Sequence, residues 1–139
     1  MAVLDLMVGQ KTTRKLRLTE DHVRKYAELT GDHNPLHFDP EFAAKTPFGR
    51  PVVHGGLTSG ILNALVAEDM PGPGTVFMSM DLKFTAPVFI GDTITATAEV
   101  LDLHDSKPVC TLAVEIVRED GVVVLSGTTG CYQFLADAE

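Results

Sequence analysis

An aspartate and a histidine lie close together in the segment GDHNPLH, residues 31–37, and these two side-chain types can exchange protons with a substrate. Carboxyl and imidazole groups have reference pKa values near 3.9 and 6.5, and partial burial can place the pair where one group takes a proton and the other gives one near neutral pH. A fully extended chain would hold Asp32 and His37 up to about 17 Å apart, so they can cooperate only if the chain turns. Asn34-Pro35 favours such a turn, because proline fixes its own φ and asparagine before proline initiates turns.

A second candidate feature is the segment His54-Gly55-Gly56, which begins an apolar stretch. Glycines at the start of a buried helix leave backbone N–H groups uncovered, and the helix dipole reinforces their positive charge. Such groups suit an oxyanion that develops during a reaction. Taken singly, Asp32 and His37 also fit an ordinary turn residue and a loop histidine, and the glycines fit close packing. Their combination favours catalysis.

A metal site is an alternative use of the same side chains, and the spacing argues against it. The Asp32-x-Asn34 opening resembles a calcium loop, but His37 occupies the glycine position and Ala43 the glutamate position. A zinc site would need more nitrogen or sulfur ligands, and His54 is the one nearby candidate. No metal and no cofactor are therefore expected.

The composition predicts a single soluble domain over residues 1–139. Hydrophobic residues make up 45% of the chain, without the run of about 18 apolar residues that a membrane helix needs. Asp5 and the lack of an early basic cluster argue against a secretory signal, so a cytoplasmic location is expected. The net charge of −8 argues against nucleic-acid and membrane partners. Cys110 and Cys131 lack metal-binding spacing and are predicted to be buried, reduced thiols.

Two helices are predicted around the candidate residues. Thr19 suits an N-cap, acids follow it, and Gly31 suits the C-terminal cap, which predicts a helix over residues 20–30. Residues 32–54 are punctuated by proline and glycine, with a possible helical turn at 40–46. Residues 54–70 are apolar on nearly every side, which predicts a helix in the middle of the protein.

The second half of the chain changes to a two-residue repeat, which is typical of strands with one buried face. Residues 74–84, 92–103 and 110–118 all show this alternation. The turn at 119–121 joins the third strand to residues 122–134 as an antiparallel hairpin. The expected fold class is α+β, with one long central helix wrapped by a curved antiparallel sheet. On the first of these strands, the apolar face consists of Val76, Met78, Met80, Leu82 and Phe84.

Three segments together resemble the R-specific enoyl-CoA hydratases of the MaoC-like dehydratase group: GDHNPLHFD, HGG within GRPVVHGGL, and FTAPVFIGDTI. The resemblance covers most of the chain and implies a hot-dog fold and a homodimer whose two sheets join edge to edge. It also implies an acyl-CoA thioester substrate and reversible hydration of a trans-2-enoyl-CoA to a (3R)-hydroxyacyl-CoA.

The same resemblance implies a role for each candidate residue. Asp32 and His37 would be the catalytic pair, with Asn34 holding the turn between them. The Gly55 N–H would donate to the thioester carbonyl, and Asn34 and His54 complete the predicted oxyanion and substrate-binding group.

Two residues depart from the family pattern. Gly56 stands where members often carry methionine, and Asn63 stands where some hydratases carry a serine near the catalytic pair. Three other functions remain open: a dehydratase for a carrier-bound or specialised acyl thioester, a thioesterase, and a non-catalytic hot-dog subunit. Hot-dog thioesterases generally carry an acid on the central helix, and residues 57–67 contain none. The candidates for the wall of an acyl tunnel are Phe42, Leu57, Phe77 and Met78.

Overall fold

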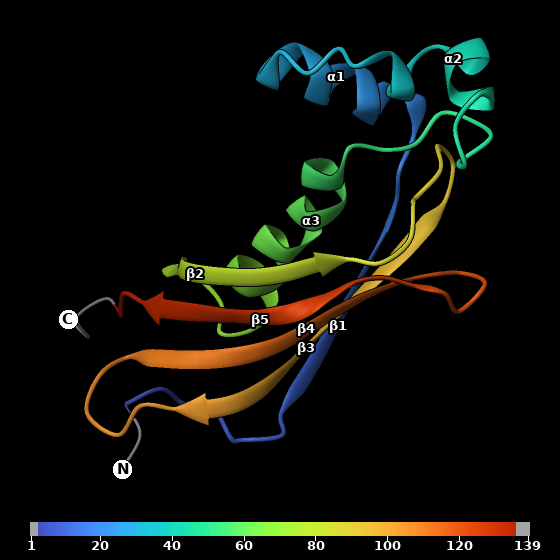
Figure 1. Ribbon diagram of the computed structural model, residues 1–139. Coiled ribbons are helices and arrows are strands. Elements are labelled where there is room, and N and C mark those ends of the chain that lie inside the picture. The colour runs from blue at the N-terminus through green and yellow to red at the C-terminus, as the bar shows by residue number, and fades with distance from the viewer. Residues whose placement is uncertain (1–2, 136–139) are drawn as a thin grey trace.

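The computed structural model describes residues 3–135, which build a five-stranded sheet curved around one helix (Figure 1). The strand order is β1-β3-β4-β5-β2, and all neighbouring strands are antiparallel. The α+β prediction is therefore confirmed. In chain order the elements are β1 (Lys11–Arg17), α1 (Glu20–Thr30), η1 (Pro35–His37), α2 (Pro40–Ala44), α3 (Gly55–Ala64), η2 (Leu65–Asp69), β2 (Thr75–Phe84), β3 (Thr93–Leu103), β4 (Val109–Arg118) and β5 (Val123–Gln133).

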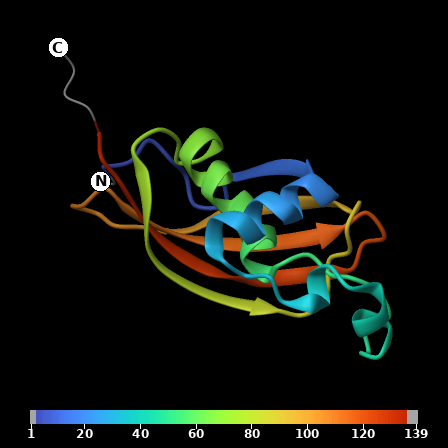
Figure 2. The same cartoon turned by 90° about the horizontal axis from the view of Figure 1, so that it is seen from above.

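Helix α3 lies in the hollow of the curved sheet, and α1 lies beside its N-terminal end (Figures 1 and 2). The contact between the two helices includes the ring of Tyr26 on α1, which packs on the ring of His54 at 4.8 Å between centroids. Helix α3 continues past Ala64 as the single π-helical turn η2. The predicted central helix is confirmed. No helix within residues 3–135 is long and apolar enough to cross a membrane.

The hydrophobic core lies between α3 and the sheet. On β3, alternate side chains face inward and are fully buried, as the two-residue repeat predicts. They belong to the same hydrophobic cluster as Leu62 of α3 and Leu65 of η2. Cys110 and Cys131 are buried, free and directly opposite each other on β4 and β5, which agrees with the predicted reduced thiols.

Helix α1 has the predicted ends. The Thr19 side chain accepts the N–H of His22, and the His22 ring accepts the N–H of Thr19, which together form a capping box. At the other end Gly31 adopts φ = 82°, a conformation that glycine reaches without steric cost, and its N–H donates to Ala27 O. The helix therefore stops immediately before Asp32.

Strand β1 was not predicted from the sequence, where it appears only as a basic segment. It pairs antiparallel with β3, from Lys11 opposite Glu99 to Arg17 opposite Thr93. Its side chains alternate between exposed and half-buried, but mostly polar residues occupy both sets of positions. Hydrophobic periodicity therefore could not reveal this strand.

Strand β2 was predicted correctly as an element. The predicted burial of its apolar side chains is wrong for the single chain. Val76, Met78, Met80 and Phe84 are 46%, 55%, 44% and 57% exposed. The strand pairs only with β5, lies at the edge of the sheet, and changes register between Phe77 and Ser79. No element within residues 3–135 covers Val76, Met78 or Met80, whereas one side of the Phe84 ring lies close to Gly55.

Candidate active site

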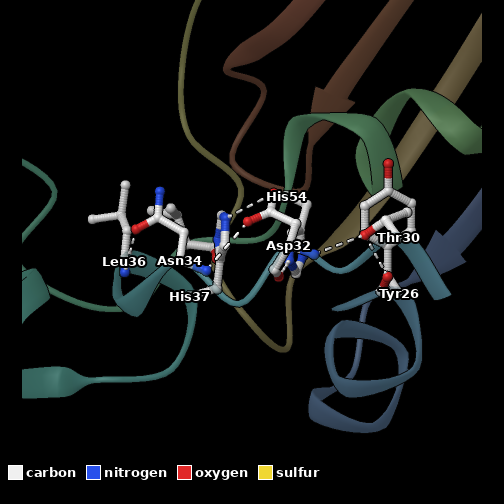
Figure 3. A network of polar contacts seen from close by, with 8 residues as sticks. Tyr26, Thr30, Asp32, Asn34, Leu36, His37 and His54 are labelled. Atoms are coloured by element: carbon white, nitrogen blue, oxygen red, sulfur yellow. Dashed lines mark hydrogen bonds and ion pairs between the residues drawn. The ribbon is translucent and has the colours of Figure 1, made fainter. Parts of the chain in front are cut away.

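The chain turns between the two candidate catalytic residues, as the sequence predicts. The Asn34 side chain accepts the N–H of Leu36, and the His37 N–H donates to Asn34 O, which closes the short helix η1. The turn brings Asp32 Oδ2 to 3.9 Å from His37 Nε2 (Figure 3). This separation is too long for a direct hydrogen bond, and it is short enough for one water molecule to contact both atoms.

The carboxylate of Asp32 is held by one oxygen and free at the other. Its Oδ1 accepts the N–H of Asn34 at 3.2 Å. The Asp32 N–H donates to the Thr30 hydroxyl, which itself donates to Tyr26 O at the end of α1. These bonds fix the backbone and one carboxylate oxygen, so Oδ2 is the atom available for chemistry.

The imidazole of His37 is buried, and the position of its proton follows from its hydrogen bond. Its Nδ1 lies 2.7 Å from Val52 O. Because a carbonyl oxygen only accepts, Nδ1 carries the proton and Nε2 of the neutral ring has a free lone pair. That lone pair belongs to the nitrogen nearest Asp32 Oδ2, so the neutral site presents two proton acceptors side by side.

The ring of His54 lies against the ring of His37, with centroids 3.8 Å apart and planes at 28°. It is 2% exposed, and its Nε2–H donates to Asp32 O at 3.0 Å. Burial is the largest influence on this group and lowers its pKa below the usual value, although the hydrogen bond to Asp32 opposes that shift. The ring is therefore neutral at pH 7, and its buried Nδ1 has no hydrogen-bond partner among residues 3–135.

The N-terminal turn of α3 supplies uncovered N–H groups beside this pair. His54 is the N-cap residue but makes no side-chain bond to the turn. The first N–H groups of a helix have no acceptor within the helix, and here the first is that of Gly55. A Cβ on Gly55 would meet the ring of Phe84 at 3.2 Å, whereas a Cβ on Gly56 would overlap the hydroxyl of Tyr26.

A cavity of about 410 Å³ lies beside the site, between α3 and the segment that follows β2. His37 and Gly55 line it, together with mostly apolar side chains such as Phe48 and Val88. Asp32, Asn34 and His54 are not among the residues that line it. The cavity therefore joins a proton acceptor, an N–H donor and an apolar surface.

The four residues predicted for the wall of an acyl tunnel do not line this cavity. Phe42 and Met78 are 46% and 55% exposed, and Leu57 faces a different groove beside β1. Asn63 is exposed on α3 and makes no hydrogen bond to the catalytic pair within the described residues.

Asp32, His37 and His54 place possible metal-ligand atoms within 4.8 Å of one another. The geometry of the two rings fits a metal ion poorly. Nearly parallel imidazoles direct their in-plane lone pairs along separate planes, whereas tetrahedral zinc needs lone pairs that converge. The Nε2 of His54 is also occupied by its bond to Asp32 O. Protons are better suited than a metal to this group of atoms.

The sequence predicts the side chains that this turn brings together, but not the atoms that hold them. The carbonyl of Val52, the hydroxyl of Thr30 and the ring of Tyr26 were not predicted. Residue type gives no signal for a main-chain carbonyl, and Thr30 and Tyr26 fit an ordinary helix face equally well. The signal that could have been used is the spacing of Tyr26 and Thr30, which are neighbours on a helix surface.

A helix in the hollow of an antiparallel sheet, with an Asp–His pair at the start of that helix, defines a hot-dog protein equipped for proton transfer. The chain belongs to the MaoC like domain family, whose sequence profile matches residues 7–120. It is 40% identical over 127 residues to an (R)-specific enoyl-CoA hydratase of Aeromonas caviae, covering 91% of this chain and 95% of that protein.

Two further similarities agree with this assignment. A 3-hydroxybutyryl-CoA dehydratase of Methylorubrum extorquens is 40% identical over 86% of this chain and 76% of its own length. The solved structure of an (R)-hydratase from A. caviae involved in PHA biosynthesis matches with a TM-score of 0.89 and 38% identity. That match covers 94% of this chain and 98% of the other, and it confirms the predicted hot-dog fold.

Proposed function

We propose that the protein is a hydro-lyase that reversibly hydrates trans-2-enoyl-CoA to (3R)-hydroxyacyl-CoA. The observation that carries this proposal is the approach of Asp32 Oδ2 to His37 Nε2 beside a cavity that the Gly55 N–H group reaches. The names of the similar hydratase and dehydratase support a CoA thioester substrate and the R product.

The geometry suits each part of the reaction. A water oxygen can lie about 2.8 Å from both Asp32 Oδ2 and His37 Nε2 and donate one hydrogen to each. As its oxygen attacks C3, the pair takes one proton and returns one to C2, so that water is added without net release of protons. Asp32 and His37 act as a coupled pair in this transfer, which is why one proton is assigned to both.

The negative charge that develops on the thioester oxygen needs a donor that is already in place. Gly55 is the first residue of α3 and lines the same cavity as His37. Such preorganised N–H donors stabilise an oxyanion more in a dry site than in water. We assign this role to Gly55, and to Asn34 the role of holding the turn that carries Asp32.

The decisive assay follows loss of enoyl absorbance with crotonyl-CoA and with a longer trans-2-enoyl-CoA, together with the chirality of the product. Wild type should consume at least one ester and yield the R alcohol, and Asp32→Asn should be slower by orders of magnitude. An inactive wild type, or an S product, would reject the proposal. An acyl thioester of a carrier protein is the third substrate to test. Activity on this ester alone, with binding that weakens from low to high salt, would favour the carrier-bound alternative.

We also propose that the protein is a homodimer in which two copies of β2 join. The strand is a sheet edge with free backbone groups and four exposed apolar side chains, and such edges invite pairing with another chain. A twofold dimer covers this edge with an identical one and needs no other component. Light scattering coupled to size exclusion should give about twice the chain mass of 15.0 kDa.

Two broader predictions from the sequence stay proposals. One hydrophobic cluster spans the described elements, which supports a single domain over residues 1–139 that limited proteolysis should leave whole. The cytoplasmic location is tested by cell fractionation.

A further inference from the structure

We propose that His54 is a positioning residue, which holds the backbone of Asp32 and packs under His37 so that the two reactive atoms face each other. This inference rests on the proposed hydratase function and gives a role to a buried histidine that the reaction does not otherwise use. A hydrogen bond, a ring contact and the place of His54 in the chain support this role.

The hydrogen bond ties the ring directly to the catalytic acid. His54 Nε2–H donates to Asp32 O at 3.0 Å, across 22 residues of sequence. The Asp32 N–H and Oδ1 are held from within its own loop, by Thr30 and Asn34. The bond from His54 is the one that fixes this residue to the start of α3, where the N–H donor lies.

The ring contact restrains the catalytic histidine from a second direction. His37 is already held in its plane by the bond from Nδ1 to Val52 O. The His54 ring lies 3.8 Å away and nearly parallel, so it opposes tilting of the His37 ring out of that plane. On its other side the His54 ring is backed by Tyr26. Figure 3 shows His54 between the turn that carries His37 and the helix that carries Tyr26.

The position of His54 in the chain connects these contacts to the oxyanion donor. Val52 O holds His37, His54 holds Asp32, and Gly55 follows at the next position. One four-residue segment therefore sets the relative positions of the acid, the histidine and the N–H donor. A displacement of about 1 Å between such groups can lower a rate by about 10²-fold, so a small shift of this segment should lower kcat strongly.

His54 does not line the cavity, so its effect should fall on turnover rather than on substrate binding. It is also buried and neutral, with Nε2 as the protonated nitrogen, which is the tautomer that the bond to Asp32 O requires. A residue that only filled space would need neither a donor at Nε2 nor a particular tautomer. These two properties separate positioning from packing.

Three substitutions separate the donor from the ring. The amide nitrogen of His54→Gln can reach the place of Nε2 and donate to Asp32 O. His54→Asn carries the same amide one methylene shorter, at the place of Nδ1, and His54→Phe keeps a ring without any donor. We expect kcat for crotonyl-CoA to fall about 10²-fold in the Asn and Phe variants, with KM within about twofold, and His54→Gln to recover about tenfold of that loss.

Thermal unfolding of the three variants provides the control for folding. Unchanged kcat in a folded His54→Phe, or equal losses in folded Gln and Asn variants, would overturn the inference. So would a loss that falls mainly on KM.

A measurement independent of activity separates this inference from the proposed function. Nitrogen-15 NMR of the histidine rings of the wild type should show His54 as a neutral ring protonated at Nε2. An Nδ1–H tautomer or an imidazolium at pH 7 would overturn the positioning role even in an active hydratase. An inactive wild type with the expected tautomer would instead reject the function and the catalytic role that depends on it.

Discussion

Two regions of this molecule depart in opposite ways from the usual distribution of polar and apolar residues. Around residues 30–55, two histidine rings are buried, and one nitrogen of each is hydrogen-bonded to a main-chain carbonyl. Along β2, large apolar side chains are exposed at the edge of the sheet. Buried polar groups and exposed apolar patches are the two departures that most often mark function.

The difference lies in what each region needs to be complete. In the site, hydrogen bonds within one chain fix both catalytic residues: Val52 and His54 hold His37 and Asp32. On β2, no element within residues 3–135 covers the exposed side chains, and the proposed homodimer would cover them with a second copy. If the first region serves the reaction and the second the dimer, separate substitutions should disrupt each one alone.

The largest expected effect comes from removing the reactive nitrogen while keeping its support. In His37→Asn the amide nitrogen replaces Nδ1 and can still donate to Val52 O, but Nε2 is lost. We expect hydration to slow by about 10²- to 10⁴-fold, the usual contribution of a general acid–base group, with the oligomeric state of the wild type unchanged. Steady-state kinetics and the unfolding temperature provide the check. Activity within about tenfold of wild type would show that His37 is not part of the proton-transfer pair.

The next largest effect is expected from a substitution on β2, which should change the oligomeric state without changing the geometry of the site in each chain. In Met80→Asp a charge replaces an exposed apolar side chain on β2, and a twofold interface brings that charge near its copy. Like charges across an interface cost several kcal/mol, so sedimentation should shift from dimer to monomer.

Strand β1 at the opposite edge supplies the control for this substitution. Thr13→Asp places the same charge on an exposed position of that strand and should stay dimeric. If Met80→Asp remained a dimer at micromolar concentration, β2 would not be the interface.

Strands β2 and β3 also differ in how well their burial could be predicted from the sequence. The alternation in residues 92–103 and in residues 74–84 predicts strands with one apolar face, and both strands exist. Periodicity does not report what covers a face, and it misses the register change after Phe77, which places Phe77 and not Val76 on the face of Met80. The buried face of β3 was therefore predicted correctly, and the exposed face of β2 was not.

For the site, residue types and turn signals predicted Asp32, Asn34, His37 and Gly55 because each carries a reactive or conformational property of its own. The support by Val52 O was unpredictable, since every residue has a carbonyl and only the fold selects one. The stacking of His54 on His37 likewise depends on where α3 begins relative to the turn.

A smaller effect is expected where the chain departs from the family pattern at Gly56. A Cβ there would overlap the hydroxyl of Tyr26, so Gly56→Ala should lower the free energy of unfolding by about 1–3 kcal/mol. In the Tyr26→Phe background the hydroxyl is absent and the cost should shrink, which a double-mutant cycle measures.

Gly60 provides a matched control on the same helix. A Cβ at this position would meet nothing within 4 Å. Gly60→Ala should therefore raise stability by about 0.5–1 kcal/mol through helix propensity. If Gly56→Ala lowered the free energy of unfolding equally with Tyr26 and with Phe at position 26, the Tyr26 hydroxyl would not be the reason why position 56 needs a glycine.

The smallest expected effect is a pH dependence of stability that only the polar region should show. Burial lowers the pKa of His54 in the folded state, whereas in the unfolded chain the pKa of this histidine is about 6.5. Above that pH the ring is neutral in both states and the full stability is present. As pH falls below it, the unfolded state binds a proton that the folded state does not, so the free energy of unfolding decreases until pH reaches the folded pKa.

Urea unfolding between about pH 7.5 and 5.5 measures this dependence. The free energy of unfolding should change less steeply with pH in His54→Gln than in wild type. Met78→Ser on β2 should keep the wild-type slope, because no titrating group is changed, and a wild-type slope in His54→Gln would mean that other groups produce the pH dependence.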